Sequence, residues 1–271
     1  MNAPSATTSP DKPETPEENT GPSRLLLALE GRAVLEWLSV PLAMPWLQRH
    51  VPAGDGHAVL IIPGFLAGDS STLPLRRFLD RRGYRTQGWL QGRNLGPRNG
   101  VIAQLVQQLG ELHDSSGGKV SLIGWSLGGI LARELARQHP QWVRQVITLG
   151  SPLYGTPQTS TNVWRLYQHF NARHEQEIER GEGAPPVPTT SIFSRADGIV
   201  GWKGSLEQQG KQIDNIEVKS ASHLGLGINP MVWFIVGERL AQKESEWKPF
   251  AATGLCRWLT RSYPLAAPTT R

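Results

Sequence analysis

Cysteine is almost absent from this sequence: Cys256 is the single one among 271 residues. One thiol cannot form a disulfide framework, and it cannot build a thiolate metal site. No cluster of histidine and carboxylate residues has the spacing of metal ligands, so we expect no metal. The glycine-rich stretches lack both the P-loop lysine and the dinucleotide-binding spacing, so we expect no nucleotide cofactor either.

Basic runs interleaved with aromatic residues are also missing, although the formal net charge is +5. Residues 1–23 hold four acidic residues against one lysine, a net of −3, which leaves +8 for the rest of the chain. A basic body of this kind faces anionic partners or simply remains soluble. Without a basic and aromatic stripe, we expect no nucleic-acid partner.

The N-terminus lacks the features of a secretory signal, namely a basic start followed by an apolar core. Residues 1–22 are rich in Pro, Thr, Ser and Glu and poor in apolar residues. Such a segment buries too little apolar surface to offset its ordering entropy, and we expect a disordered tail. The expected location is the cytoplasm, with the inner face of a membrane as a further possibility.

Residues 23–50 form an apolar stretch that is too interrupted to span a bilayer. Charged residues and prolines divide it: Glu30, Arg32, Glu36, Pro41 and Pro45. The pattern predicts an amphipathic helical segment with Ser23 as its N-cap. Two interpretations stay open: the segment packs on the domain, or residues 24–48 make peripheral contact with a membrane surface.

Residues 51–250 alternate between strand and helix patterns, and we assign them to one α/β domain followed by a C-terminal extension, 251–271. Short apolar or β-branched runs predict strands at 58–64, 84–90, 119–124, 145–150, 190–194 and 215–220. Apolar residues at helical spacing predict helices at 71–83, 99–113 and 127–139. This order implies a mostly parallel central sheet that is covered by helices on both faces.

The motif Gly124-Trp125-Ser126-Leu127-Gly128 lies between a predicted strand and a predicted helix. A serine on such a sharp turn has its hydroxyl above the sheet, and the crowded turn requires glycine on either side. G-x-S-x-G alone arises often by chance, and a plain helix cap is the alternative. The strand before it and the helix after it favour a nucleophile.

A nucleophilic serine needs a base, and the base needs an acceptor that orients it. His223 follows a predicted strand and therefore lies at the same sheet edge as Ser126. Asp197 also follows a strand, and the order Ser, Asp, His along the chain is typical of triads whose serine lies on a strand-to-helix turn. Asp214 precedes a strand and therefore belongs at the opposite edge of the sheet. Asp69 lies just past the first strand and is a more distant candidate for the acid.

The tetrahedral oxyanion of acyl transfer requires backbone donors. The N–H of Leu127, directly after the nucleophile, is the first donor we expect. The second comes from the loop after the first strand, where Gly64 permits a turn that presents the N–H of Phe65. Leu66 is the alternative to Phe65.

With these residues, the chain resembles the α/β-hydrolases, and among them the bacterial lipases and esterases, over residues 57–242. The segment LGSPLYGTP, residues 149–157, is similar to a lipase segment that usually reads T-P-H or S-P-H, but it has Leu153 and Tyr154 instead. Pro63-Gly64 stands where a His-Gly pair often opens the oxyanion loop. The resemblance implies an α/β-hydrolase fold and a lipid or ester substrate.

Residues 157–189 do not extend the sheet, and they contain apolar residues at helical spacing between 163 and 170. The resemblance implies a lid at this position. A packed surface helix without a gating role is an equal alternative.

The function we expect is cleavage of a carboxylic ester by a Ser126-His223-Asp197 triad through an acyl-enzyme. An acyltransferase or a thioesterase with the same triad is the first alternative, because the pocket selects the acceptor. A non-catalytic, membrane-associated interaction protein that keeps the fold is the second.

Overall fold

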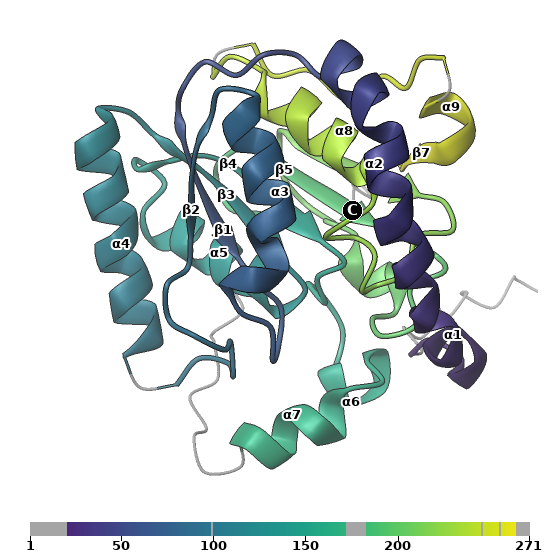
Figure 1. Ribbon diagram of the computed structural model, residues 1–271. Helices are drawn as coiled ribbons and strands as arrows, with labels where there is room; N and C mark the ends of the chain where they lie inside the picture. The colour runs from purple at the N-terminus through teal and green to yellow at the C-terminus, as the bar shows by residue number, and fades with distance from the viewer. Residues whose placement is uncertain (1–20, 99, 172–182, 245, 255, 264–271) are drawn as a thin grey trace, which may run out of the picture.

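The computed structural model describes residues 21–98, 100–171, 183–244, 246–254 and 256–263, and its centre is a seven-stranded sheet (Figure 1). The strand order is β2-β1-β3-β4-β5-β6-β7, and all neighbours are parallel except β6 and β7. The strands are β1 (Ala58–Ile62), β2 (Arg85–Gly88), β3 (Val120–Trp125), β4 (Val143–Leu149), β5 (Thr189–Phe193), β6 (Ile213–Val218) and β7 (Thr260–Tyr263).

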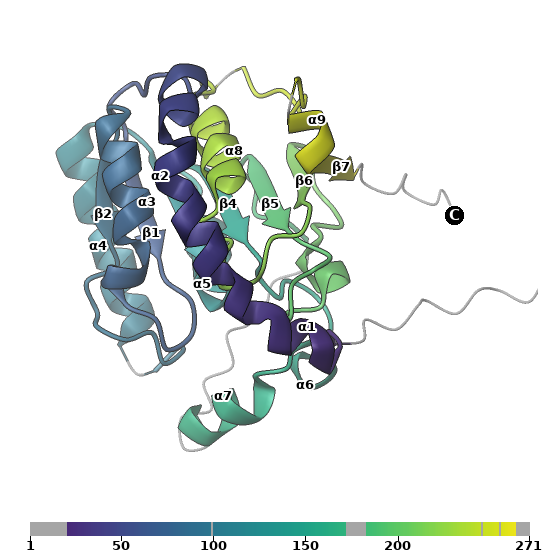
Figure 2. The ribbon, with the colours of Figure 1, turned by 45° about the vertical axis from the view of Figure 1, so that its right-hand side comes forward.

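Helices cover both faces of the sheet (Figures 1 and 2). The α-helices are α1 (Arg24–Ala28), α2 (Ala33–His50), α3 (Asp69–Arg81), α4 (Val101–Ser116), α5 (Leu127–Gln138), α6 (Pro157–Ser160), α7 (Trp164–Asn171), α8 (Pro230–Leu240) and α9 (Cys256–Leu259). Two 3-10 helices are η1 (Leu29–Arg32) and η2 (Trp202–Ser205). The mostly parallel, two-sided α/β architecture expected from the sequence is confirmed.

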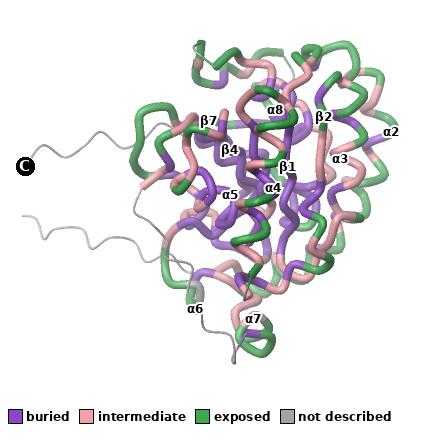
Figure 3. The backbone as a smooth tube through the Cα atoms, turned by 90° about the vertical axis from the view of Figure 1, so that its left-hand side faces the viewer, coloured by how far each residue is buried: buried purple, intermediate pink, exposed green. Residues whose placement is uncertain are grey.

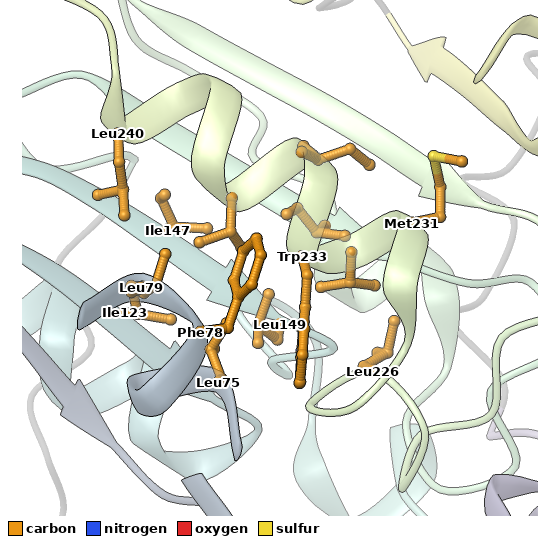
Figure 4. Packing of buried hydrophobic residues seen from close by; sticks show 14 of the residues in the cluster. Leu75, Phe78, Leu79, Ile123, Ile147, Leu149, Leu226, Met231, Trp233 and Leu240 are labelled. Carbon is orange, nitrogen blue, oxygen red and sulfur yellow. The ribbon is translucent and has the colours of Figure 1, made fainter. Parts of the chain in front are cut away.

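The central strands are buried on both faces, which explains why their sequences are continuously apolar (Figure 3). In β1, Val59 and Ile61 belong to a core shared with α2, α3 and α8. Leu60 and Ile62 point the other way, into a core shared with α4 and α5. In the first core, the rings of Phe78 and Trp233 stack at 5.2 Å (Figure 4).

Two elements near the C-terminus were not predicted from the sequence. Helix α8 begins at Pro230 behind Asn229, whose side chain accepts a hydrogen bond from the N–H of Met231. Strand β7 pairs with β6 inside 251–271, the segment that the sequence assigned to an extension. Strand β7 reads TRSY and is half exposed, so its apolar signal is weak.

The N-terminal helical segment is α1, η1 and α2, and Ser23 caps it as predicted by accepting from the N–H of Leu26. Pro41 and Pro45 do not end α2, because each is exposed and removes one hydrogen bond of a long helix. The 3-10 turn η1 makes the break instead. Among the described residues, no helix is both long enough and apolar enough to cross a membrane.

We expect Leu47→Ala to lower the free energy of unfolding by about 2–5 kcal/mol, because Leu47 is completely buried where α2 packs on the domain. Leu42→Ala on the same helix is the matched control: Leu42 is 85% exposed, and its change stays within about 0.5 kcal/mol. Denaturant titration of both variants measures the difference. Equal stabilities would mean that α2 is not docked through Leu47.

Candidate active site

Ser126 has a backbone conformation that a residue with a side chain rarely adopts, with φ 53° and ψ −119°. It lies directly between β3 and α5, and its N–H donates to the carbonyl of Leu149 at the end of β4 (2.8 Å). Such strain persists only where the surroundings enforce it, and it is concentrated at functional sites. The sharp strand-to-helix turn predicted from the motif is therefore present.

The glycines of the motif are explained by close backbone contacts. A Cβ on Gly128 would lie 2.3 Å from the carbonyl oxygen of Ile62 in β1. A Cβ on Gly124 would lie 2.3 Å from the carbonyl oxygen of Gly128. Any side chain at either position would push α5 away from the sheet, so the tight turn depends on both glycines.

His223 and Asp197, the predicted base and acid, are hydrogen-bonded and buried. The Nδ1 atom of His223 lies 2.6 Å from Oδ2 of Asp197. The other carboxylate oxygen of Asp197 accepts from the N–H groups of Ile199 (2.8 Å) and Val200 (2.7 Å), which orient the acid. This arrangement directs Nε2 of His223 away from Asp197 and makes it available to a substrate or a hydroxyl.

Ser126 is joined to this pair through its neighbour Trp125. The indole Nε1 of Trp125 donates to the carbonyl of His223 (3.2 Å). Ser126, Asp197 and His223 follow the carboxyl ends of β3, β5 and β6, which are parallel and share one edge of the sheet. The three predicted residues therefore lie at the same edge of the sheet.

Burial alone would lower the pKa of His223, but the pKa is raised above its ordinary value. The charge and hydrogen bond of Asp197 favour the imidazolium, and the carboxylate of Glu30 adds to this. The surroundings of His223 therefore stabilise its protonated form.

The weaker acid candidates have structural roles. Asp214 binds Arg239 (2.6 Å) at the opposite edge of the sheet and accepts from the N–H of Phe250. Asp69 accepts from the N–H groups of Trp89 (2.9 Å) and Leu90 (3.0 Å) and fixes the end of β2.

The loop after β1 touches the serine, because a Cβ on Gly64 would lie 3.2 Å from Cβ of Ser126. The N–H of Leu66 donates to the carbonyl of Asn94 (2.7 Å) and is therefore occupied. Because the N–H of Leu66 is already used, Phe65 is the favoured second donor to the oxyanion. Leu127 is the first residue of α5, where backbone N–H groups have no partner within the helix.

Helix α7 of the predicted lid lies against the same loop. The ring of Phe65 is 5.3 Å from that of Tyr167 and 6.1 Å from that of Phe170. Gating by this helix stays a prediction, and residues 172–182 of the predicted 157–189 insert lie outside the described residues.

Comparison with known proteins gives consistent results. A family model described as a PGAP1-like alpha/beta domain matches residues 89–222. Serine hydrolase BPHL from Mus musculus is 29% identical over 126 residues, which are 42% of either chain. Its Homo sapiens counterpart is 28% identical over 133 residues, 45% of this chain and 46% of that protein. The chain thus matches less than half the length of these curated relatives.

Two solved structures have the same fold. Bacillus licheniformis lipase BlEst2 in its mature form superposes with a TM-score of 0.52 at 15% identity, over 70% of this chain and 94% of that one. Aspergillus fumigatus lipase B superposes with a TM-score of 0.53 at 18% identity, over 73% of this chain and 58% of that one. The chain has the α/β-hydrolase fold and is similar in sequence to the serine hydrolases named above.

Sequence reasoning missed one part of the site: the N-terminal segment. Glu30 and Glu36 were taken only as interruptions of an apolar stretch, but both point inward. Glu30 accepts from the N–H of His223 (3.0 Å), and Glu36 from the N–H of Ser222 (2.8 Å). The signal available was the presence of carboxylates on the side of the helix that carries the buried Ala33 and Val40.

We expect Asp197→Asn to lower the pKa of His223, because the charge that offsets burial is removed. Histidine-selective NMR titration of the wild type and the variant measures this pKa. Asp214→Asn is the matched control and leaves the His223 titration unchanged, since Asp214 binds Arg239 at the other sheet edge. Identical titrations of His223 in the wild type and in Asp197→Asn would contradict the pairing.

Proposed function

We propose that this chain is a serine hydrolase that cleaves carboxylic esters by way of an acyl-enzyme, with Ser126 as nucleophile, His223 as general base and Asp197 as the orienting acid. The observation that carries the proposal is the strained turn at Ser126 on the sheet edge where the buried His223–Asp197 pair also lies, with Nδ1 and Oδ2 at 2.6 Å. A helix-capping serine would need neither the strain nor the pair.

The reaction follows from these roles. The Oγ of Ser126 attacks the ester carbonyl carbon while its proton passes to Nε2 of His223. The N–H groups of Phe65 and Leu127 stabilise the oxyanion. The tetrahedral intermediate collapses, and the leaving alkoxide takes the proton from His223 and departs as an alcohol. His223 then takes a proton from a water molecule as that water attacks the acyl-enzyme. The second tetrahedral intermediate collapses, the carboxylic acid leaves, and the Oγ of Ser126 takes the proton back from His223.

An apolar acyl group fits the surroundings of the serine best. The rings of Phe65, Tyr167 and Phe170 cluster over the loop that touches Ser126. Leu224, the residue after His223, is 45% exposed. Aromatic and aliphatic surface beside Ser126 and His223 favours a lipidic substrate over a charged one.

Labelling with a fluorophosphonate probe tests the nucleophile. We expect wild type to be labelled and Ser126→Ala to be dark, because the probe bonds covalently to an activated serine. His223→Ala should react at least about 1,000-fold more slowly. Ser115→Ala, at an exposed serine near the end of α4, is the control and keeps the wild-type rate.

A folded wild type that stays unlabelled, with and without liposomes, would contradict the proposal and favour the interaction protein. If labelling succeeds, turnover of p-nitrophenyl esters in buffer alone identifies water as the acceptor. Turnover that requires an added alcohol or thiol would instead identify an acyltransferase.

We further propose that the segment of α1, η1 and α2 contacts the surface of an anionic lipid bilayer. Eight large apolar side chains of this segment are at least 39% exposed: Leu25, Leu27, Leu29, Val34, Leu35, Trp37, Leu38 and Leu42. In α2, Leu35, Leu38 and Leu42 recur at helical spacing and form one outward face, and Figure 2 shows the helix running across the outside of the molecule.

A bilayer suits this face for two reasons. A helix with an apolar outer side and a tryptophan lies in the headgroup region of a membrane. Exposed Arg24 and Arg49 flank the face, and the chain beyond residue 23 carries a net charge of +8, because residues 1–23 hold −3 of the total of +5. Anionic lipid headgroups complement that charge.

We expect Leu35→Gln/Leu42→Gln to weaken binding to vesicles of mixed neutral and anionic lipid about tenfold or more, because two exposed leucine side chains that would insert into the bilayer are lost. Vesicle co-sedimentation measures the effect, with neutral vesicles as the comparison. Trp258→Gln on α9, at a tryptophan that is 78% exposed, is the control and binds as wild type does. Equal binding of the double variant, or no binding by wild type, would contradict the contact.

A further inference from the structure

Glu30 is a buried carboxylate far in sequence from the catalytic loops, yet it binds both of them. It is 5% exposed and lies in the 3-10 turn η1. Its Oε1 accepts from the N–H groups of Gly198 (2.7 Å) and His223 (3.0 Å). Its Oε2 accepts from the N–H of Leu224 (2.9 Å).

These three donors come from the two loops that carry the acid and the base. Gly198 directly follows Asp197, and the other donors are His223 itself and its neighbour. A single side chain therefore connects the backbone of the acid loop to that of the histidine loop. Hydrogen bonds to a charged acceptor are about twice as strong as neutral ones, so this connection is rigid.

Two further side chains of the segment support the same loops. The guanidinium of Arg32 donates to the carbonyls of Ala196 and Ala221, one in each loop. Glu36 accepts from both the N–H and the hydroxyl of Ser222 (2.8 and 2.6 Å). The backbone on either side of Asp197 and of His223 is thus bound by side chains of the N-terminal segment.

We propose that Glu30 is a positioning residue of the triad: it aligns His223 with Asp197 and stabilises the imidazolium during proton transfer. This inference rests on the function proposed above. The charged groups that face His223 are Asp197 from the loop after β5 and Glu30 from η1. Arg32 and Glu36 bind the residues that precede it in its loop.

Glu30→Gln distinguishes stabilisation of the His223 imidazolium from purely structural support of the two loops. The amide keeps the size of the carboxylate but loses its charge, and it presents an NH₂ group where one oxygen accepted. Removing a negative charge lowers the pKa of His223. Since the base must be neutral, the rise of activity with pH then has its midpoint at a lower pH. Misalignment lowers the plateau, by between about ten- and a hundredfold.

Glu30→Asp distinguishes the effect of the negative charge from the effect of side-chain length. It keeps the negative charge but is one methylene shorter and cannot bind both loops at once. We expect its midpoint to stay close to that of wild type while its plateau falls. Glu111→Gln, at an exposed glutamate on α4, is the matched control and retains both the wild-type midpoint and the wild-type plateau.

The experiment measures the second-order rate constant of fluorophosphonate labelling against pH for wild type and the three variants, corrected for the folded fraction. The NMR resonance of the His223 Nδ1 proton is titrated on the same samples. A lower midpoint in Glu30→Gln with a lower plateau in both Glu30 variants supports the inference. Wild-type midpoints and plateaus in both variants would overturn it, whatever their thermal stability.

The two proposals fail in different ways. If wild type is not labelled, the proposed function fails, but the NMR titration still reports whether Glu30→Gln lowers the pKa of His223. An unchanged titration would overturn the role of Glu30 even if labelling proves the serine reactive. If Glu30→Gln does not fold, Glu30→Asp decides through its plateau.

Discussion

The close approach of α5 to the sheet is the constraint on which the site depends. Gly128 lies so near the carbonyl of Ile62 that no side chain fits between helix and strand. Because α5 begins there without a looser turn, Ser126 has to adopt φ 53° and ψ −119°. The strain is maintained by apolar packing of α5 in the core beneath. The position of one hydroxyl thus depends on helix–sheet packing as a whole.

The remaining parts of the site lie on loops, which need other means of support. Asp197 is oriented by two N–H groups of its own loop and by the imidazole of His223. The histidine loop is longer and touches the indole of Trp125 on one side and Glu30 on the other. In these loops, hydrogen bonds from backbone N–H groups to carboxylates replace the inter-strand hydrogen bonds that would position Asp197 and His223 if they lay in a strand.

The N-terminal segment has apolar side chains on its outer side as well as on the side that packs on the domain. Glu30 and Glu36 point toward the catalytic loops, whereas leucines and a tryptophan face outward. Val40 and Leu47 dock it in the apolar core, and Ala43, Met44 and Trp46 pack against that core as well. The proposed bilayer contact uses the outward leucines, whereas Glu30 of η1 and Glu36 of α2 support the histidine loop from the inner side.

The sequence by itself determined the alternation of strands and helices, the serine turn and the order of Ser126, Asp197 and His223, because these depend on local periodicity and on glycines at fixed offsets. It did not reveal α8, β7 or the inward direction of Glu30. The 3-10 turn η1 rotates Glu30 toward loops 168 and 193 residues away, and no local pattern encodes that contact. Tertiary structure decided it, since a buried carboxylate is stable only where folding brings N–H donors to it.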